Sequence, residues 1–589
     1  MSSSMTGPTN NNTTLTKNMA GMSDLPDELL ALIAEYLSTS LRDIHTCVFL
    51  NHTLSSFFIS CLWRNIDILH CYPKEPKLYH FGRFARFKAA SIDTGGLARN
   101  GRFIRTLRGV SADWLPFFGP NICPFLECVE IDGYNDHQED KESTVKGMKK
   151  GRVALAAFLG QHISGTLRKL SLARNILWCR TEEQYLALMR VIPQSVEELR
   201  LYQWDGNCFG DEDTGNSGWG QYIDIEDVQN FQAEYPRLRA AAAAATTALI
   251  PEPTSTIRKD LKDILPNIKK LVLEYSIIDG IGLDRLLSWI PGLESLAIYG
   301  SSIPHVFDFT RSLRDSCPLL TALNISSTNN NKGMASLPGL AYPVLLCASL
   351  RGWRTLALSS DKPVNARTLW QASLFHHVNT LETLYLEGFH TNTDDDDTFM
   401  RQLLGSSPRL KHFIVAHSKD YGMTWSKISE TSNWVCRDLE VFRVPFIYLG
   451  YTLDDGEERN RFQQQLYRQL ARLTNLKELI FGEMEDDELF LDNRDGYGGQ
   501  RQPQYHQPII SDNIHPQDFL ANDFYSPEMT LESGMGVLKD LKQLRRVGLK
   551  GVQPHAFLKS EEDRVWVKEN WPLLQQEYRN DFWKVFRRW

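Results

Sequence analysis

The side chains best suited to chemistry lie in three short clusters. Adjacent histidines stand at His376 and His377, two cysteines lie close together at Cys123 and Cys128, and aspartates run from Asp394 to Asp397. Adjacent side chains diverge on a helix, and no carboxylate lies at metal-ligand spacing from the histidine pair. The cysteines lack flanking histidines, and a solvated loop is the simpler interpretation of the aspartates. None of the three clusters predicts a metal site.

The sequence also lacks the short motifs that organise common active sites. It contains no phosphate-binding loop, no GxGxxG that opens a helix, no HExxH and no GxSxG. Gly95-Gly96 precedes Leu97-Ala98-Arg99, which predicts a turn and not a phosphate cradle. We therefore expect no enzyme, no catalytic residue, no cofactor and no metal. An enzyme with an unrecognised active site is the alternative.

Composition narrows the class of protein. The 589 residues are 42% hydrophobic and 23% charged, with a net charge of −8, which is ordinary for a soluble globular protein. The absence of a basic stripe argues against a nucleic-acid or membrane-surface partner. No apolar run approaches the roughly 18 residues that a membrane helix needs. Ten cysteines without a CxxC pair indicate reduced thiols, so we expect a cytoplasmic or nuclear protein.

The N-terminal part divides into a leader and a small helical unit. Residues 1–22 are rich in Ser, Thr and Asn and predict a disordered leader. Ser23 or Asp24 can cap a following helix, and Pro26-Asp27-Glu28 suit its first turn. Its apolar arc of roughly 160° exceeds the usual core-facing stripe. That arc comprises Leu29, Leu30, Leu32, Ile33, Tyr36 and Leu37. A unit this small has little core, so surplus apolar surface should meet the rest of the chain or a partner.

Residues 23–68 resemble an F-box. Leu25-Pro26-Asp27-Glu28-Leu29-Leu30, Ile33 and Tyr36-Leu37 follow the family's first helix, and Leu62-Trp63-Arg64-Asn65-Ile66 matches its end. The middle, Leu50-Asn51-His52-Thr53-Leu54, departs from the Cys-Arg-Trp-like stretch of many F-boxes. The resemblance implies binding to a Skp-family adaptor and, through it, to a cullin ubiquitin ligase. The adaptor-binding residues that it implies are Leu25, Pro26, Leu29, Leu30, Ile33, Leu37 and Trp63. A helical cap on a larger domain is the alternative.

The rest of the chain repeats a short pattern, apolar-x-x-apolar-x-apolar. Its twelve occurrences begin at Leu126, Leu167, Val196, Ile268, Leu293, Leu320, Trp353, Leu381, Leu410, Leu439, Leu476 and Leu544. From Ile268 to Leu439 the starts lie 25 to 33 residues apart, close to the roughly 20–29 residues of leucine-rich repeats. The consensus asparagine is mostly absent, and Asn175 is its cleanest match. Chance leucine spacing in an unrelated α/β domain is the alternative.

Helix-like stretches at 283–290 and 399–404 separate the patterns. We therefore predict an α/β fold, a leucine-rich-repeat solenoid over residues 69–575 with a curved parallel sheet and outer helices, preceded by the small helical F-box. Inserts interrupt it near 205–262 and 484–530. The first, which is acidic, Gly-rich and Ala-rich, should project from the solenoid, with at most a short helix within 224–249. The second predicts a long loop.

The C-terminal end carries aromatic residues suited to capping a solenoid. Trp566 and Trp571-Pro572 predict a cap, followed by an aromatic tail at 576–589. Fungal F-box proteins with degenerate leucine-rich repeats end in a similar Trp…Trp-Pro-x-Leu stretch, and the unit at 434–440 also resembles theirs. The resemblance to that group covers residues 23–575.

A binding face follows from the strand pattern. Residues between the apolar positions should face the concave side and stay exposed, and Tyr and Arg are favoured at binding hot spots. This predicts a substrate-binding set of Arg200, Tyr202, Glu274, Tyr299, Tyr385, Glu387 and Arg443, with Asn324 and Ser326 beside it. An ordinary mixed solvated face is the alternative. The resemblance implies a substrate-recognition subunit of an SCF-type ubiquitin ligase. A ligase-independent leucine-rich-repeat scaffold is the alternative.

Overall fold

The computed structural model places its strands in one simple order. It describes residues 25–37, 41–49, 52–68, 87–131, 141–162, 165–173, 182–202, 204, 229–230, 232–237, 239–240, 264–276, 280–301, 303, 306–326, 341–359, 372–387, 396–416, 433–444, 456–482, 529–550 and 560–574. The described strands, β1 to β14, follow sequence order, and every pairing given below is parallel. The chain divides into two compact units, residues 1–110 with 116–128, and residues 111–115 with 129–589.

The first unit is built on three helices, α1 (Asp27–Leu37), α2 (Leu41–Val48) and α3 (His52–Arg64). Their shared core comprises Leu30, Ala34, Ile44, Cys47, Leu54 and Phe58. Helix α3 leads directly into β1 (Asn65–Asp67), which pairs with β2 (Thr106–Val110). Between these strands lie the helical turns η2 (Lys88–Ile92), α5 (Gly96–Asn100) and η3 (Gly101–Phe103), and η4 (Ala112–Phe118) follows β2.

Strands β1 and β2 were not predicted, although both keep most of the repeat pattern. Trp63, Ile66 and Ile68 have its spacing at β1, where we assigned them to the end of the helical unit. Ile104 and Leu107 begin it at β2, but Gly109 occupies the third apolar position. Gly109 has a φ of 68°, a backbone conformation that glycine adopts readily. The repeat pattern therefore begins at Trp63 in the last turn of α3 and continues into β1.

In the second unit, each of the twelve predicted patterns carries one strand. They are β3 (Cys128–Ile131), β4 (Lys169–Leu172), β5 (Glu198–Tyr202), β6 (Lys270–Glu274), β7 (Ser295–Tyr299), β8 (Ala322–Ser326), β9 (Thr355–Ser359), β10 (Thr383–Glu387), β11 (His412–Ala416), β12 (Val441–Val444), β13 (Glu478–Gly482) and β14 (Arg546–Lys550). The helices are α6 (Lys141–Gln161), α8 (Glu182–Arg190), α10 (Gly280–Ser288), α11 (Val306–Ser316), α12 (Ala341–Leu346), α14 (Asp396–Ser406), α16 (Gly456–Leu470), η7 (Met535–Asp540) and α18 (Glu561–Asn570). This arrangement confirms the predicted α/β class with a parallel sheet.

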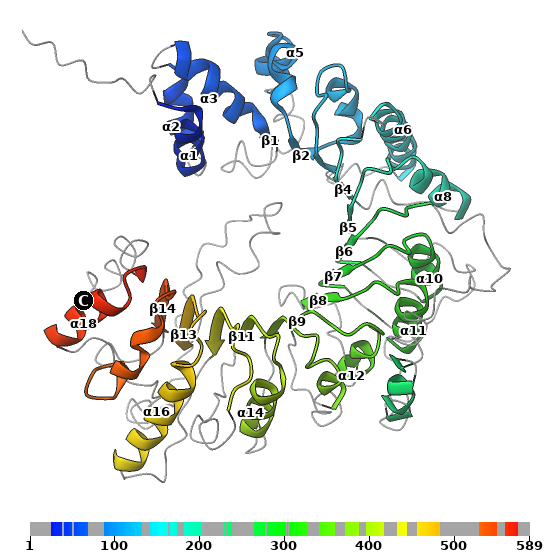
Figure 1. The fold of residues 1–589 in the computed structure, drawn as a ribbon. Helices are drawn as coiled ribbons and strands as arrows, with labels where there is room; N and C mark the ends of the chain where they lie inside the picture. Colours follow the sequence, from blue (N-terminus) through cyan, green and yellow to red (C-terminus); the bar gives the residue numbers. More distant parts are fainter. Residues whose placement is uncertain are drawn as a thin grey trace, which may run out of the picture. The chain divides into compact units, whose positions relative to one another are not determined.

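Equivalent pattern positions pair with one another across the sheet. Leu271 of β6 pairs with Leu199 of β5 and Leu296 of β7, and the same register continues through Leu384 to Phe413 and Phe442. Leu271, Leu273 and Leu384 are 0% exposed and Leu386 is 3% exposed, as predicted. Figure 1 shows α10, α11, α12, α14 and α16 on the same side of these strands, which covers their buried face.

Serine hydroxyls join successive turns where the consensus repeat has asparagine. Ser276 follows the β6 pattern at that position and Ser301 follows the β7 pattern there. The Trp204 N–H donates to Ser276 Oγ at 3.1 Å, and the Ser276 N–H donates to Ser301 Oγ at 3.0 Å. Hydroxyls can satisfy backbone groups that leave a strand, so Ser276 and Ser301 connect the segments that follow neighbouring strands.

The insert between β5 and β6 corrects one prediction. Its described residues 229–230, 232–237 and 239–240 are helical, and we name them the insert helix. Tyr235 is 0% exposed, and its ring lies 5.7 Å from His376 and 5.6 Å from His377. The insert therefore does not simply project, because the buried Tyr235 ring anchors its described helical residues against the repeats. The remaining insert residues lie outside the described part.

The C-terminal aromatic cap is confirmed for the described residues. Trp571 is 0% exposed, donates from Nε1 to the Leu538 carbonyl at 3.1 Å, and meets Trp566 edge-on at 5.3 Å. Helix α18 begins with a capping box in which Ser560 and Asp563 bond each other's backbone N–H. The predicted leader 1–22, the caps Ser23 and Asp24, most of the loop at 484–530 and the tail at 576–589 lie outside the described residues.

We expect Tyr235→Ala to lower the free energy of unfolding by about 3 kcal/mol, because it removes a fully buried aromatic side chain. Urea denaturation of the full chain measures the change. Glu234→Ala, on the exposed side of the same helix, is the matched control and should change stability little. Equal stability of the two variants would contradict the docked insert helix.

Candidate partner-binding surfaces

The helical unit presents apolar side chains that its own core does not use. Leu29 is 45% exposed, Leu32 is 60% exposed and Phe49 is 73% exposed. Helix α1 begins with the Leu29 and Leu30 N–H groups donating to the Pro26 carbonyl, at 3.0 and 3.1 Å. This start turns Leu30 into the core and leaves Leu29, about 100° around the helix, exposed on a neighbouring face. Exposed apolar side chains clustered on a small unit suit a protein partner.

The structure distributes the expected adaptor-binding residues over core and surface. Leu30 is 2% exposed and belongs to the core, and Leu25 and Ile33 pack against that core while partly exposed. Pro26 is exposed, Trp63 is half-buried, and the side chain of Leu37 lies outside the described part. Leu32 and Phe49 were missed as candidates. Leu32 was part of the apolar arc of the first helix. The width of that arc does not indicate which of its residues the small core of the unit leaves exposed.

On the sheet, strands β5 to β8 bring several expected substrate-binding residues together. Arg200 Nη1 lies 3.6 Å from Glu274 Oε1, and the side chains are 15% and 12% exposed. Asn324 Nδ2 donates to Tyr299 Oη at 3.0 Å. The ring of Tyr202 meets Tyr275 edge-on at 5.4 Å. These side chains form a half-buried polar and aromatic surface, which we name the tyrosine face: Arg200, Tyr202, Glu274, Tyr275, Tyr299 and Asn324.

Tyr275 is the member of the tyrosine face that sequence analysis missed. It follows β6 with a φ of 50°, a left-handed conformation that is uncommon for tyrosine. Its N–H donates to the Tyr299 carbonyl at 2.8 Å, which holds the backbone in place. Such conformations persist where surrounding contacts over-determine them. The left-handed conformation of Tyr275 could not be predicted from its neighbours in sequence, because a contact with the next strand imposes it.

Two expected surface residues are buried, which corrects the prediction that they stay exposed. Tyr385 is 8% exposed and clusters with Ala357 and Ile414 from the neighbouring strands. Arg443 is 5% exposed and forms an ion pair with Glu478, which Arg546 also approaches at 3.5 Å. Strands flank these positions on both sides, so neighbouring side chains cover them. Glu387 is half-buried. Tyr385 and Arg443 therefore contribute little accessible surface for a partner.

A row of alternating charge runs along the sheet at the position directly after the first apolar residue of each pattern. In the second unit this edge row comprises Arg168, Glu197, Lys269, Glu294, Thr321, Arg354, Glu382, Lys411, Glu440, Lys477 and Arg545. Each backbone N–H in the row donates to the carbonyl of the row residue before it, as from Glu382 to Arg354 at 2.8 Å and from Lys411 to Glu382 at 2.8 Å. The row is therefore a continuous feature of the sheet.

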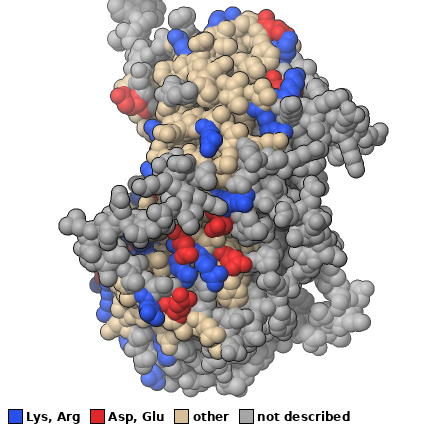
Figure 2. Space-filling view, turned by 90° about the vertical axis from the view of Figure 1, so that its right-hand side faces the viewer, with Lys and Arg blue, Asp and Glu red and all other residues tan. Residues whose placement is uncertain are grey.

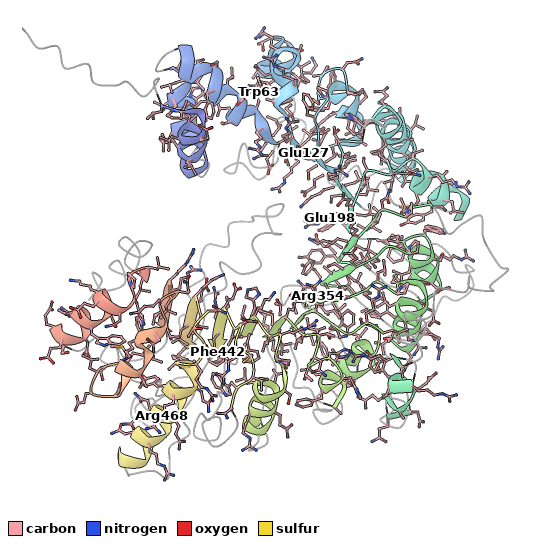
Figure 3. All side chains as sticks on the ribbon, in the orientation of Figure 1. Trp63, Glu127, Glu198, Arg354, Phe442 and Arg468 are labelled. Atoms are coloured by element: carbon pink, nitrogen blue, oxygen red, sulfur yellow. The ribbon has the colours of Figure 1, made fainter. Side chains whose placement is uncertain are left out.

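Side chains of the edge row form ion pairs in both directions. Glu197 lies 2.9 Å from Arg168 and 3.5 Å from Lys269, while Glu382 lies 2.9 Å from Arg354 (labelled in Figure 3) and 3.3 Å from Lys411. Partial burial raises the pKa of Glu382, but hydrogen bonds from Arg354 and Lys411 outweigh that effect and leave the pKa below its ordinary value. Figure 2 likewise shows acidic and basic side chains intermixed on one face.

Four of the buried cysteines lie in surroundings that keep their thiols protonated. Burial raises the pKa of the Cys123, Cys317, Cys347 and Cys436 thiols to about 12, far from the range of a reactive thiolate. The seven cysteines of the described residues are free. Across the part of the chain that the structure describes, no group of three His, Cys, Asp or Glu side chains has the geometry of a metal site. The surfaces above suit binding.

No model of a protein family matches the chain, and no curated protein matches it. Among the described helices, none combines the length and apolar character that crossing a bilayer requires.

We expect Glu382→Gln to lower stability at neutral pH by about 0.5–2 kcal/mol, because it removes the anion between two cations. Since the pKa of Glu382 is lowered, this contribution exists above the ordinary carboxyl pKa of about 4.3 and disappears as pH falls through the lower folded value. Thermal denaturation at low and high salt measures it, and Glu294→Gln in the same row is the control. An effect that is unchanged in 1 M salt would contradict the ion-pair explanation.

Proposed function

We propose that this chain is a substrate-recognition subunit of an SCF-type ubiquitin ligase. The observation that carries the proposal is a three-helix unit with F-box-like ends that closes its own core and still exposes Leu29, Leu32 and Phe49. Direct continuation of α3 into a parallel repeat sheet supports it, since that joins a docking module to a binding scaffold. The helical unit docks on a Skp-family adaptor, and the adaptor connects to a cullin.

The repeat part is a leucine-rich-repeat solenoid in this proposal. In-register apolar positions, one strand per pattern and serines in place of the consensus asparagine support that assignment. The tyrosine face is the proposed substrate surface, because its tyrosines, arginine and asparagine are half-buried and preorganised by mutual contacts. Tyr299 and Tyr202 are its central residues.

The proposed mechanism is proximity and not bond chemistry. Holding a target lysine near a charged ubiquitin carrier raises its effective concentration into the millimolar range or above. No residue of this chain makes or breaks a bond in that scheme, and no cofactor or metal takes part. The complex works in the cytoplasm or nucleus, where cysteines stay reduced.

Adaptor binding tests the proposal directly. We expect Leu29→Asp combined with Leu32→Asp to abolish co-purification of the chain with a Skp-family adaptor, because each change puts a charge into an apolar contact. Both side chains are exposed, so the fold should survive, as circular dichroism and the melting temperature of the isolated chain would show. Val153→Asp in α6 changes an equally exposed apolar residue and should leave adaptor binding intact.

Two results would overturn the proposal. Wild-type chain that fails to bind the adaptor would favour the ligase-independent scaffold. Binding that survives unchanged in the double variant would place the adaptor surface elsewhere. A wild-type complex with adaptor, cullin and ubiquitin carrier should also form ubiquitin conjugates, and the double variant should not.

A further inference from the structure

The insert helix lies over a buried polar cluster of the repeats. Gln232 Nε2 donates to Ser373 Oγ, Tyr235 Oη donates to the Ser349 carbonyl, and Arg239 Nη1 donates to the His376 carbonyl. These acceptors belong to turns that carry β9 and β10, more than 100 residues further along the chain. The helix is thus held by one buried ring and three polar contacts on segments distant in sequence.

His377 lies beneath this contact. It is 0% exposed, and its ring centroid lies 5.6 Å from Tyr235 and 6.3 Å from Trp353. The Trp353 N–H donates to His377 Nδ1 at 3.3 Å, so Nδ1 must be unprotonated. Nε2 is buried and has no hydrogen-bond partner among the described residues. The cluster therefore accommodates a neutral imidazole. A hydrogen bond with the Leu346 backbone would favour the imidazolium, but burial and the neighbouring positive charges outweigh it.

The charged groups around His377 reinforce that preference. Burial is the main cause that holds its pKa well below the ordinary value, followed by the positive charges of Arg239 on the insert helix and of the neighbouring His376. Directly after α12, Cys347 contributes a thiol whose pKa burial raises to about 12, so it stays neutral. From α11, the Arg314 guanidinium acts on that thiol and opposes part of the rise in its pKa.

The sheet does not need the insert helix in order to stay paired. Strands β5 and β6, which flank the insert in sequence, pair directly from Glu198 with Lys270 to Tyr202 with Glu274. The insert helix can leave without breaking this register. A glycine also marks the contact, because a Cβ at Gly352 would lie 2.7 Å from Arg239 Nη2 and 2.5 Å from Thr380 Oγ1. The repeat surface is shaped for close approach of the helix.

We propose that the insert helix is a pH-sensitive latch, in which protonation of His377 releases residues 229–240 from the turns around β9 and β10 while the sheet stays folded. In the closed state a proton added at Nδ1 would face the Trp353 N–H, and the resulting imidazolium would be fully buried close to the positive charge of Arg239. In the open state His377 reaches water and can be charged. Release would expose Tyr235 and the covered surface beside α12, so acidification would change which outer surface the repeats present.

The size and direction of the effect follow from linkage. A histidine whose folded pKa is lowered stabilises the closed state above the ordinary pKa of about 6.5, and that stabilisation is lost as pH falls below it. If the open state has the ordinary pKa, the opening constant rises about tenfold between pH 7.5 and pH 5.5. His376 contacts the same tyrosine, and its pKa is lowered in the same direction, so it contributes a smaller response of the same sign.

Hydrogen exchange of the full chain tests the latch at pH 7.5 and pH 5.5, with rates corrected for the intrinsic effect of pH. We expect protection of residues 229–240 to fall about tenfold at pH 5.5 while strands β10 and β11 keep theirs. His377→Gln keeps an acceptor for the Trp353 N–H and should remove most of this fall. His412→Gln changes a half-buried histidine on β11 and is the control, so the tenfold loss of protection should remain. His376→Gln should keep most of that loss.

Three results would overturn the latch. They are wild-type protection that is equal at both pH values, a tenfold fall that persists in His377→Gln, and a parallel loss of protection in β10 and β11. If His377→Gln fails to fold, Tyr235→Ala decides the question. Its insert helix should already be unprotected at pH 7.5 and show no further response to acid, and a remaining tenfold response would contradict the proposal.

Discussion

In-register stacking of equivalent apolar positions is the interaction on which the rest of the second unit depends. Leu271, Leu296 and Leu323 pair along one line of the sheet, and each is at most 1% exposed. Fully burying a leucine contributes roughly 1.5–3 kcal/mol relative to leaving it exposed, and no single turn has enough neighbours to bury its own. Stability is therefore shared between adjacent turns, and any residue inserted between strands must leave this register intact.

Polar contacts help to specify the register of the strands, because a core of leucine alone could pack in more than one register. The edge row opposes Arg or Lys to Glu in successive turns, as at Arg354, Glu382 and Lys411. A shift of one whole turn would place like charges together, so the row favours the observed register more than it stabilises the fold. Close packing between turns has the same effect, because a Cβ at Gly292 would lie 2.5 Å from the Pro266 carbonyl oxygen.

The same register decides which side chains of the strand face remain accessible. Each side chain on this strand face lies between side chains of two flanking strands. In the row of Ala357, Tyr385 and Ile414, these neighbours bury one another. At the tyrosine face, smaller or polar neighbours leave Tyr202 and Tyr299 half-buried. The layer on the helix side is aromatic elsewhere, where Phe442, labelled in Figure 3, packs against Trp434 at 5.5 Å and Phe413 at 5.9 Å. Half-buried polar side chains and covered apolar rows therefore occur on one sheet.

The sequence by itself determined the parallel α/β class, the twelve strands β3 to β14 and the first helix, because each depends on spacing within about ten residues. Only tertiary structure decided that Leu30 is core while Leu29 and Leu32 are surface, that Tyr385 and Arg443 are covered, and that Tyr235 anchors the insert. Those outcomes depend on neighbours from other helices, from flanking strands or from segments more than 100 residues away, such as Ser349 for Tyr235. Local periodicity shows which apolar residues favour a buried position, whereas packing against neighbouring segments determines which of them are buried in the folded chain.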